Sequence, residues 1–224
     1  MNIRTLGVLF DLDGVLVDST PAVARTWAKW SLLHGFVADE VTRRAHGRPS
    51  ITTLRELLPN ADLEAENSQM ERWEIEDTDG VIPLPGVINL LQALPADRWA
   101  IVTSCTRPLA EVRIRVAGLP MPKYLVTSDD VQRFKPAPDP YLKGAELLKI
   151  APADCLVVED APAGIRAGKA SGASVLALRT TEVDPLLSAA GADWIVNDLA
   201  SVRLAPRSDN HHLGFSFDDE SPKL

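Results

Sequence analysis

Two aspartates stand two residues apart directly after a short apolar run near the start of the chain. Asp11 and Asp13 follow Leu6–Phe10, a run typical of a buried strand. Side chains two apart on a strand point to the same side, and open α/β sheets bind ligands at the carboxyl ends of their strands. An acidic turn would show the same pattern without any chemistry, so the interpretation depends on partners elsewhere in the chain.

A second acidic pair, Glu159 and Asp160, ends another apolar run, Cys155–Val158. If the two strands lie close together in one sheet, Asp11, Asp13 and Asp160 can converge. Clustered carboxylates repel one another unless a cation joins them, and ligation by oxygen alone favours Mg²⁺. The alternative is that Asp160 caps the helix that follows it.

Groups suited to a bound phosphate occur in two further places. Lys135 precedes a proline-rich loop, where its ammonium group could neutralise phosphate oxygens as a point charge. Thr103 and Ser104 end another apolar run before a helix, and hydroxyls and backbone N–H groups at such a turn can hold an anion. Taken alone, a lysine in such a loop is more often a solvated residue than a ligand.

Elements that could position these residues follow from the hydrophobic pattern. Short apolar runs alternate with helical patterns, which predicts an α/β fold with a parallel sheet covered on both faces. The predicted strands are Leu6–Phe10, Trp99–Thr103, Tyr124–Val126, Cys155–Val158, Val175–Leu178 and Trp194–Val196. The predicted helices of this part lie near 86–94, 107–117, 140–149, 161–171 and 183–190.

The stretch 19–82 breaks this alternation. It contains no strand pattern but shows helical patterns from Thr20 and near 39–45, 50–58 and 62–76. We therefore predict an inserted helical cap over 19–82 and a Rossmann-like core formed by 1–18 and 83–205. Residues 206–224 are predicted to form a polar, loosely ordered C-terminal tail.

Composition limits the classes of function. The 224 residues carry a formal net charge of −8, which argues against broad nucleic-acid binding because that needs basic surface. The two cysteines, Cys105 and Cys155, both lie in apolar contexts and are expected to be reduced thiols. The apolar start of the chain is too short for a signal peptide or a membrane span. We expect a cytoplasmic protein, and its oligomeric state, with a monomer as the simplest case, stays open.

The order of these motifs resembles the haloacid dehalogenase-like hydrolase superfamily. The matching residues are Asp11-Leu12-Asp13-Gly14, then Thr103-Ser104, then Lys135, then Glu159-Asp160. The stretches Trp99–Arg107 and Val158–Gly164 look closer still to the branch of sugar-phosphate and glycerol-phosphate phosphatases. This resemblance implies a Rossmann-like core with an α-helical cap inserted after the first motif.

The resemblance also implies a role for each motif. Asp11 would attack phosphorus and form an aspartyl-phosphate, while Asp13 would protonate the leaving oxygen and then deprotonate water. Mg²⁺ would be held by Asp11, the Asp13 carbonyl and Asp160, with Glu159 in support. Thr103, Ser104 and Lys135 would bind the phosphoryl group of a small phosphate ester.

A loop in the predicted cap is a candidate for substrate recognition. His46, Gly47 and Arg48 lie between two helical patterns, and Gly47 allows close approach while its neighbours offer donors to sugar hydroxyls or phosphate oxygens. An exposed turn between helices is the alternative.

Other activities are compatible with parts of the pattern. A sugar-phosphate mutase shares all four motifs, but such relatives typically carry a histidine in the first cap helix, where this chain has Pro21–Arg25. Haloacid dehalogenases lack the second aspartate of the first motif, so Asp13 counts against them. A catalytically idle binding module is the alternative from a different class.

Overall fold

A six-stranded parallel sheet forms the centre of the molecule, in a computed structural model that describes residues 1–45, 49–205 and 212–217. Its strand order is β6-β5-β2-β7-β8-β9, with β2 and β7 side by side. The strands are β2 (Gly7–Phe10), β5 (Trp99–Val102), β6 (Leu125–Val126), β7 (Cys155–Glu159), β8 (Ser174–Leu178) and β9 (Trp194–Val196). Each predicted run matches one of them to within about a residue at either end, and the predicted α/β fold class is confirmed.

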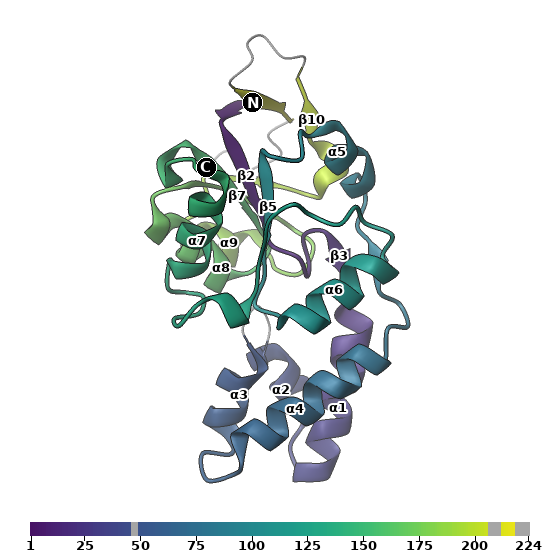
Figure 1. The fold of residues 1–224 in the computed structure, drawn as a ribbon. Coiled ribbons are helices and arrows are strands. Elements are labelled where there is room, and N and C mark those ends of the chain that lie inside the picture. The colour runs from purple at the N-terminus through teal and green to yellow at the C-terminus, as the bar shows by residue number, and fades with distance from the viewer. Residues whose placement is uncertain (46–48, 206–211, 218–224) are drawn as a thin grey trace.

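Two layers of helices cover the sheet. The helices α7 (Asp139–Leu148), α8 (Pro162–Ser171) and α9 (Asp184–Ala189) pack on one face, and α5 (Val87–Ala93) and α6 (Arg107–Val116) on the other (Figure 1). Successive residues of one strand enter different layers: Val8 and Phe10 pack with α5 and α6, and Leu9 packs with α7. Burial on both faces explains why the strands are apolar throughout.

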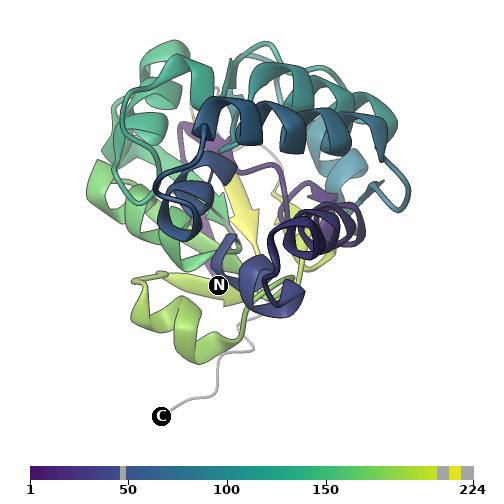
Figure 2. The ribbon, with the colours of Figure 1, turned by 90° about the horizontal axis from the view of Figure 1, so that it is seen from below.

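Four helices lie beyond the carboxyl ends of the strands (Figures 1 and 2). They are α1 (Thr20–His34), α2 (Ala38–Ala45), α3 (Ser50–Leu57) and α4 (Leu63–Glu76). They share an apolar cluster of their own, in which Trp27 and Trp30 of α1 pack with Leu54 of α3 and Met70 of α4. Gly35 ends α1 in the left-handed region at φ 74°, a conformation that costs glycine little.

The chain leaves and re-enters the core at neighbouring points. The short strands β3 (Val17–Asp18) and β4 (Ile82–Pro83) flank the four helices in sequence and pair antiparallel with each other. Both crossings therefore lie side by side, so the helices are joined to the core by two adjacent strands. In the part of the chain that the structure describes, no helix is both long and apolar enough to cross a membrane.

A second small sheet closes the opposite end of the core. It consists of β1 (Asn2–Thr5), β11 (Leu213–Ser216) and β10 (Arg203–Leu204), and three single-turn 3₁₀ helices, η1 (Ser128–Asp130), η2 (Pro152–Asp154) and η3 (Leu199–Ser201), lie elsewhere in the core. The strand β11 differs from the predicted loosely ordered tail over 206–224. Leu213, Phe215 and Phe217 are buried at a spacing of two, so this short apolar alternation pairs with β1 instead of remaining loose.

Candidate active site

Asp11 lies at the carboxyl end of β2 and is paired with a buried lysine. The Lys135 ammonium donates to Asp11 Oδ1 at 2.6 Å, to Glu159 Oε1 at 2.7 Å and to the Val102 carbonyl at 3.1 Å. The three partners come from β2, β7 and β5, which are neighbours in the sheet. Lys135 therefore joins three strand ends, and the alternative of a solvated loop residue is wrong because its side chain is only 2% exposed.

Glu159 is fixed from several directions at the end of β7. Its Oε1 accepts from the Tyr141 hydroxyl at 2.6 Å as well as from Lys135, and its Oε2 accepts the backbone N–H groups of Asp160 and Ala161. A Cβ atom at Gly164 would lie 1.6 Å from Glu159 Oε1, so the glycine leaves room for the carboxylate. Both oxygens of Glu159 thus accept hydrogen bonds from the protein, and Oε1 holds Lys135 in place.

Charge pairing keeps the lysine protonated in this buried position. Burial by itself lowers the pKa of Lys135, but the charges of Asp11 and Glu159 raise it above its ordinary value. Burial also raises the pKa of Asp11, and Lys135 opposes that effect. A divalent cation beside Asp11 would favour the ionised carboxylate further.

The carboxylates of Asp11, Glu159 and Asp160 form a group that could hold a metal ion, with one oxygen from each within 4.8 Å of the others. Gly14 makes this arrangement possible: its φ is 80°, and a Cβ there would lie 2.1 Å from Asp160 Oδ2. Since every donor is an oxygen and the site is small, the residues fit Mg²⁺.

Asp13 points elsewhere, although it follows Asp11 by two residues. Its Oδ1 accepts from the Ser19 hydroxyl at 2.6 Å, and its Oδ2 accepts from Arg113 Nη1 at 2.8 Å and the Cys105 thiol at 3.1 Å. Burial raises the pKa of Cys105 well above its ordinary value, so its sulfur carries the proton. The Asp13 carboxylate lies outside the metal-binding group, and only its backbone carbonyl remains as a predicted ligand.

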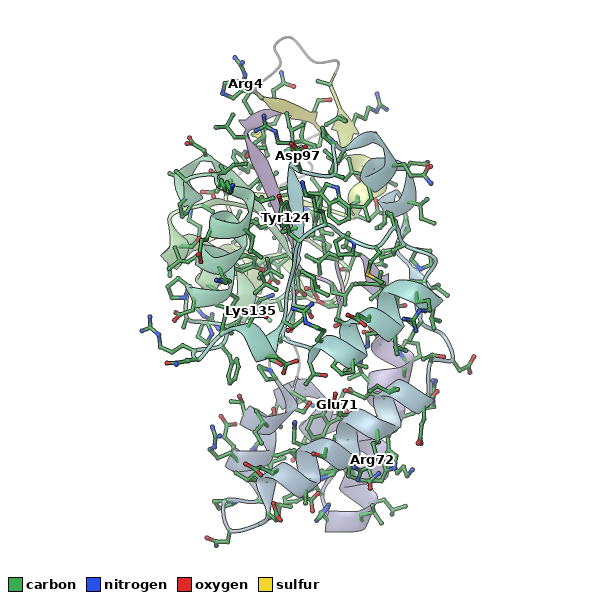
Figure 3. All side chains as sticks on the ribbon, viewed as in Figure 1. Arg4, Glu71, Arg72, Asp97, Tyr124 and Lys135 are labelled. Carbon is green, nitrogen blue, oxygen red and sulfur yellow. The ribbon has the colours of Figure 1, made fainter. Side chains whose placement is uncertain are left out.

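A cavity of about 310 Å³ lies between the strand ends and the four helices. The predicted site residues that line it are Asp11, Asp13, Thr103, Ser104 and Glu159. The helices contribute, among others, Val23, Trp27, Asn67, Glu71 and Glu74. In Figure 3, Glu71 lies on the side of α4 toward the core and Arg72 on the opposite side. The cavity thus places polar side chains from both parts of the chain around one small volume.

Thr103 and Ser104 line this cavity next to the paired charges. Thr103 is buried, and its oxygen accepts the backbone N–H of Cys105 at 3.1 Å, so the hydroxyl hydrogen can be donated to a ligand. The predicted recognition residues His46, Gly47 and Arg48 lie outside the described residues, and their role stays a prediction.

The sequence did not predict three residues that contribute to the site, which are Tyr141, Arg113 and Glu74. Tyr141 and Glu74 occupy buried positions of α7 and α4, where a sequence pattern does not distinguish packing from chemistry. Arg113 carried a usable signal, because it lies between the buried Leu109, Ala110 and Ile114 on the apolar side of α6. An arginine at a core position needs acidic partners. The sequence alone does not identify them, and the structure shows that they are Asp13 and Glu74.

With this geometry established, comparison with known proteins identifies the family. A sequence model described as haloacid dehalogenase-like hydrolase matches residues 5–172. The chain belongs to the haloacid dehalogenase-like hydrolase family. The match includes the carboxylate group, Lys135 and the four inserted helices.

Individual relatives agree with this assignment. The chain is 45% identical to hexitol phosphatase A of Escherichia coli (strain K12) over 204 residues, which cover 89% of this chain and 94% of the relative. It is 33% identical to glycerol-1-phosphate phosphohydrolase 2 of Saccharomyces cerevisiae, over 98% of this chain and 93% of the relative. A hydrolase from Pseudomonas syringae has a similar crystal structure, with a TM-score of 0.75 at 27% identity, covering 87% of this chain and 94% of that one.

Proposed function

We propose that this protein is a magnesium-dependent phosphatase that hydrolyses small sugar or polyol phosphates through an aspartyl-phosphate. The observation that carries the proposal is Asp11, which lines the cavity at the end of β2, is paired with Lys135 and lies next to Asp160. The kinship with hexitol and glycerol-1-phosphate phosphatases supports the substrate class.

In the first step Asp11 attacks phosphorus. Lys135 occupies one of its carboxylate oxygens, which leaves the other for the attack. Asp11, the Asp13 carbonyl and Asp160 would hold Mg²⁺, which when bound neutralises charge on the phosphoryl oxygens. Thr103 and Ser104 would donate hydrogen bonds to the same oxygens, and Lys135 would compensate the negative charge nearby.

Asp13 serves proton transfer in both halves of the reaction. It protonates the sugar or polyol oxygen as that oxygen leaves, and it then takes a proton from the water that attacks the aspartyl-phosphate. The partner of its Oδ1, the Ser19 hydroxyl, can donate to a carboxylate or accept from a carboxylic acid, so it suits both protonation states.

The organisation of the chain fits this chemistry. We propose that 1–18 and 83–205 form the catalytic core, and that 19–82 form a cap that encloses the leaving group. The cap residues Asn67 and Glu71 offer an amide and a carboxylate to the hydroxyls of a neutral polyol in the cavity. His46, Gly47 and Arg48 remain predicted contributors to substrate choice, and the cytoplasmic location remains an expectation from the sequence.

A panel of hexose, hexitol, pentose and glycerol phosphates tests the proposal. We expect Mg²⁺-dependent release of phosphate from at least one polyol or sugar phosphate, abolished by EDTA and restored by added Mg²⁺. Conversion of a sugar 1-phosphate to its 6-phosphate without release of phosphate would instead show a mutase. A failure to release phosphate from any member or from p-nitrophenyl phosphate would favour a binding module.

A further inference from the structure

A buried arginine joins the core to the cap beside the cavity. Arg113 belongs to α6, and its side chain is only 5% exposed. Its Nη1 donates to Asp13 Oδ2 at 2.8 Å, and its Nη2 lies 3.5 Å from Glu74 Oε1 of α4. One guanidinium therefore contacts the proposed proton-transfer group and a helix of the inserted segment.

Stability alone explains this arrangement poorly. Removing an arginine from water is costly, and buried ion pairs are often no more stable than well-packed apolar residues of the same volume. The geometry toward Glu74 is also incomplete, because Nη2 has no hydrogen-bond partner among the described residues. A small approach of α4 toward α6 would bring Glu74 within hydrogen-bond distance of that donor.

The contacts of Arg113 also distinguish the two oxygens of Asp13. A guanidinium can only donate, so Oδ2 must accept while it is held by Arg113. The other oxygen, Oδ1, is held only by the adaptable hydroxyl of Ser19 in the described structure. Proton exchange with the substrate is therefore directed to Oδ1.

We propose that Arg113 is a positioning residue that orients Asp13 for proton transfer, and that Glu74 of the cap fixes Arg113 in turn. This inference deepens the proposed function and rests on it. It assigns part of the proton-transfer geometry to the docking of α4 on α6, so that Asp13 is best oriented when the cap is in place.

The test compares two substrates with different needs for protonation. A polyol phosphate releases a strongly basic alkoxide, whereas p-nitrophenyl phosphate releases a phenolate that leaves unprotonated. For Arg113→Met we expect kcat/KM for the polyol phosphate to fall about 100-fold relative to p-nitrophenyl phosphate, the scale for a misplaced catalytic group. Arg113→Lys keeps the positive charge but lacks the paired N–H donors of the guanidinium group, so the ratio of kcat/KM values should fall about tenfold. Glu74→Gln should shift the ratio in the same direction by less.

Exposed residues of the same helices provide matched controls. Arg115→Met on α6 and Glu76→Gln on α4 should leave the ratio within about twofold, as for ordinary surface changes. The proposal would be overturned if Arg113→Lys and Glu74→Gln lowered kcat/KM equally for both substrates and in proportion to a lowered Tm. That result would mean that Arg113 has a structural role only.

A double-mutant cycle separates positioning from an independent effect. In an Asp13→Asn background, Arg113→Met should cause no further change in the substrate ratio, because its target is gone. If the full change appears again in that background, the proposal is contradicted.

Failure of the proposed function itself can be recognised separately. It would show as a wild type without phosphatase activity, or as an Asp11→Asn variant that retains it. An active wild type, an inactive Asp11→Asn and an unchanged ratio would reject only the role of Arg113.

Discussion

The site contains two similar triads that differ in where their third member lies. Asp11, Lys135 and Glu159 form one acid–base–acid series, with ammonium to carboxylate distances of 2.6 and 2.7 Å. The second consists of Asp13, Arg113 and Glu74, with distances of 2.8 and 3.5 Å. Glu159 belongs to the central sheet, whereas Glu74 belongs to the inserted helices.

The difference separates a fixed part of the site from a conditional one. The Lys135 triad is built entirely on strand ends and the loop and helix beside them, so the core alone completes it. The Arg113 triad is complete only when α4 packs against α6, because Glu74 lies on α4 and Arg113 on α6. The Asp13 side chain is also 27% exposed. The proposed attacking group is thus held by the core alone, while the orientation of the proposed proton donor depends on contact with the inserted helices.

Replacing the proposed nucleophile of the first triad, Asp11, should have the largest effect on activity. Asp11→Asn keeps the size of the side chain but cannot form an aspartyl-phosphate, so kcat should fall about 10⁶-fold on every substrate, the scale for loss of a nucleophile. Steady-state assays with a polyol phosphate and p-nitrophenyl phosphate measure this, with circular dichroism as the control for folding. Retained activity on either substrate would remove Asp11 from its role.

Asp13→Asn should have a smaller effect that depends on the substrate. A general acid contributes about 10²–10⁴-fold, so kcat/KM for a polyol phosphate should fall by that factor. The value for p-nitrophenyl phosphate should change little, because its leaving group needs no proton. Parallel losses on both substrates would show that Asp13 and Asp11 do not divide the chemistry as proposed.

The two cations should also differ in their contributions to folding. Lys135→Met leaves two buried carboxylates unpaired and should lower the free energy of unfolding by about 3–5 kcal/mol. Arg113→Met should cost less, because water can reach Asp13. Urea denaturation of both variants measures the difference, with Lys143→Met, whose side chain is 40% exposed, as reference. A larger loss for Arg113→Met would reverse the comparison.

Weakening the proposed Mg²⁺ site should give the mildest of these changes in activity. Asp160→Ala removes one charged ligand, so the Mg²⁺ concentration for half-maximal activity should rise while activity at saturation largely survives. Ca²⁺ should inhibit, since it prefers more ligands at longer distances. Asp154→Ala, which changes an exposed acid in η2 just before β7, serves as the control. Full activity with Ca²⁺, or an unchanged Mg²⁺ requirement, would contradict the assignment.

Those parts of the site that depend on strand ends could be predicted from the sequence. Asp11 and Glu159 follow unmistakable buried strands, and the carboxyl ends of parallel strands meet at one edge. The contact of Asp13 with Arg113 joins residues 100 positions apart through a helix face, and no local pattern encodes it. Similarly, β11 is short and lies between polar stretches, so its pairing with β1 depends on the tertiary fold.

The proposed roles of the two aspartates can be tested most directly in Asp13→Asn with p-nitrophenyl phosphate. The first step needs no acid with this substrate, but the second lacks its base, so the aspartyl-phosphate should accumulate. Rapid-mixing experiments should show a burst of about one nitrophenolate per active site. Mass spectrometry of acid-quenched protein should locate phosphate on the peptide that contains Asp11. Slowed but linear release with no phosphate on Asp11, or phosphate on another residue, would contradict the account.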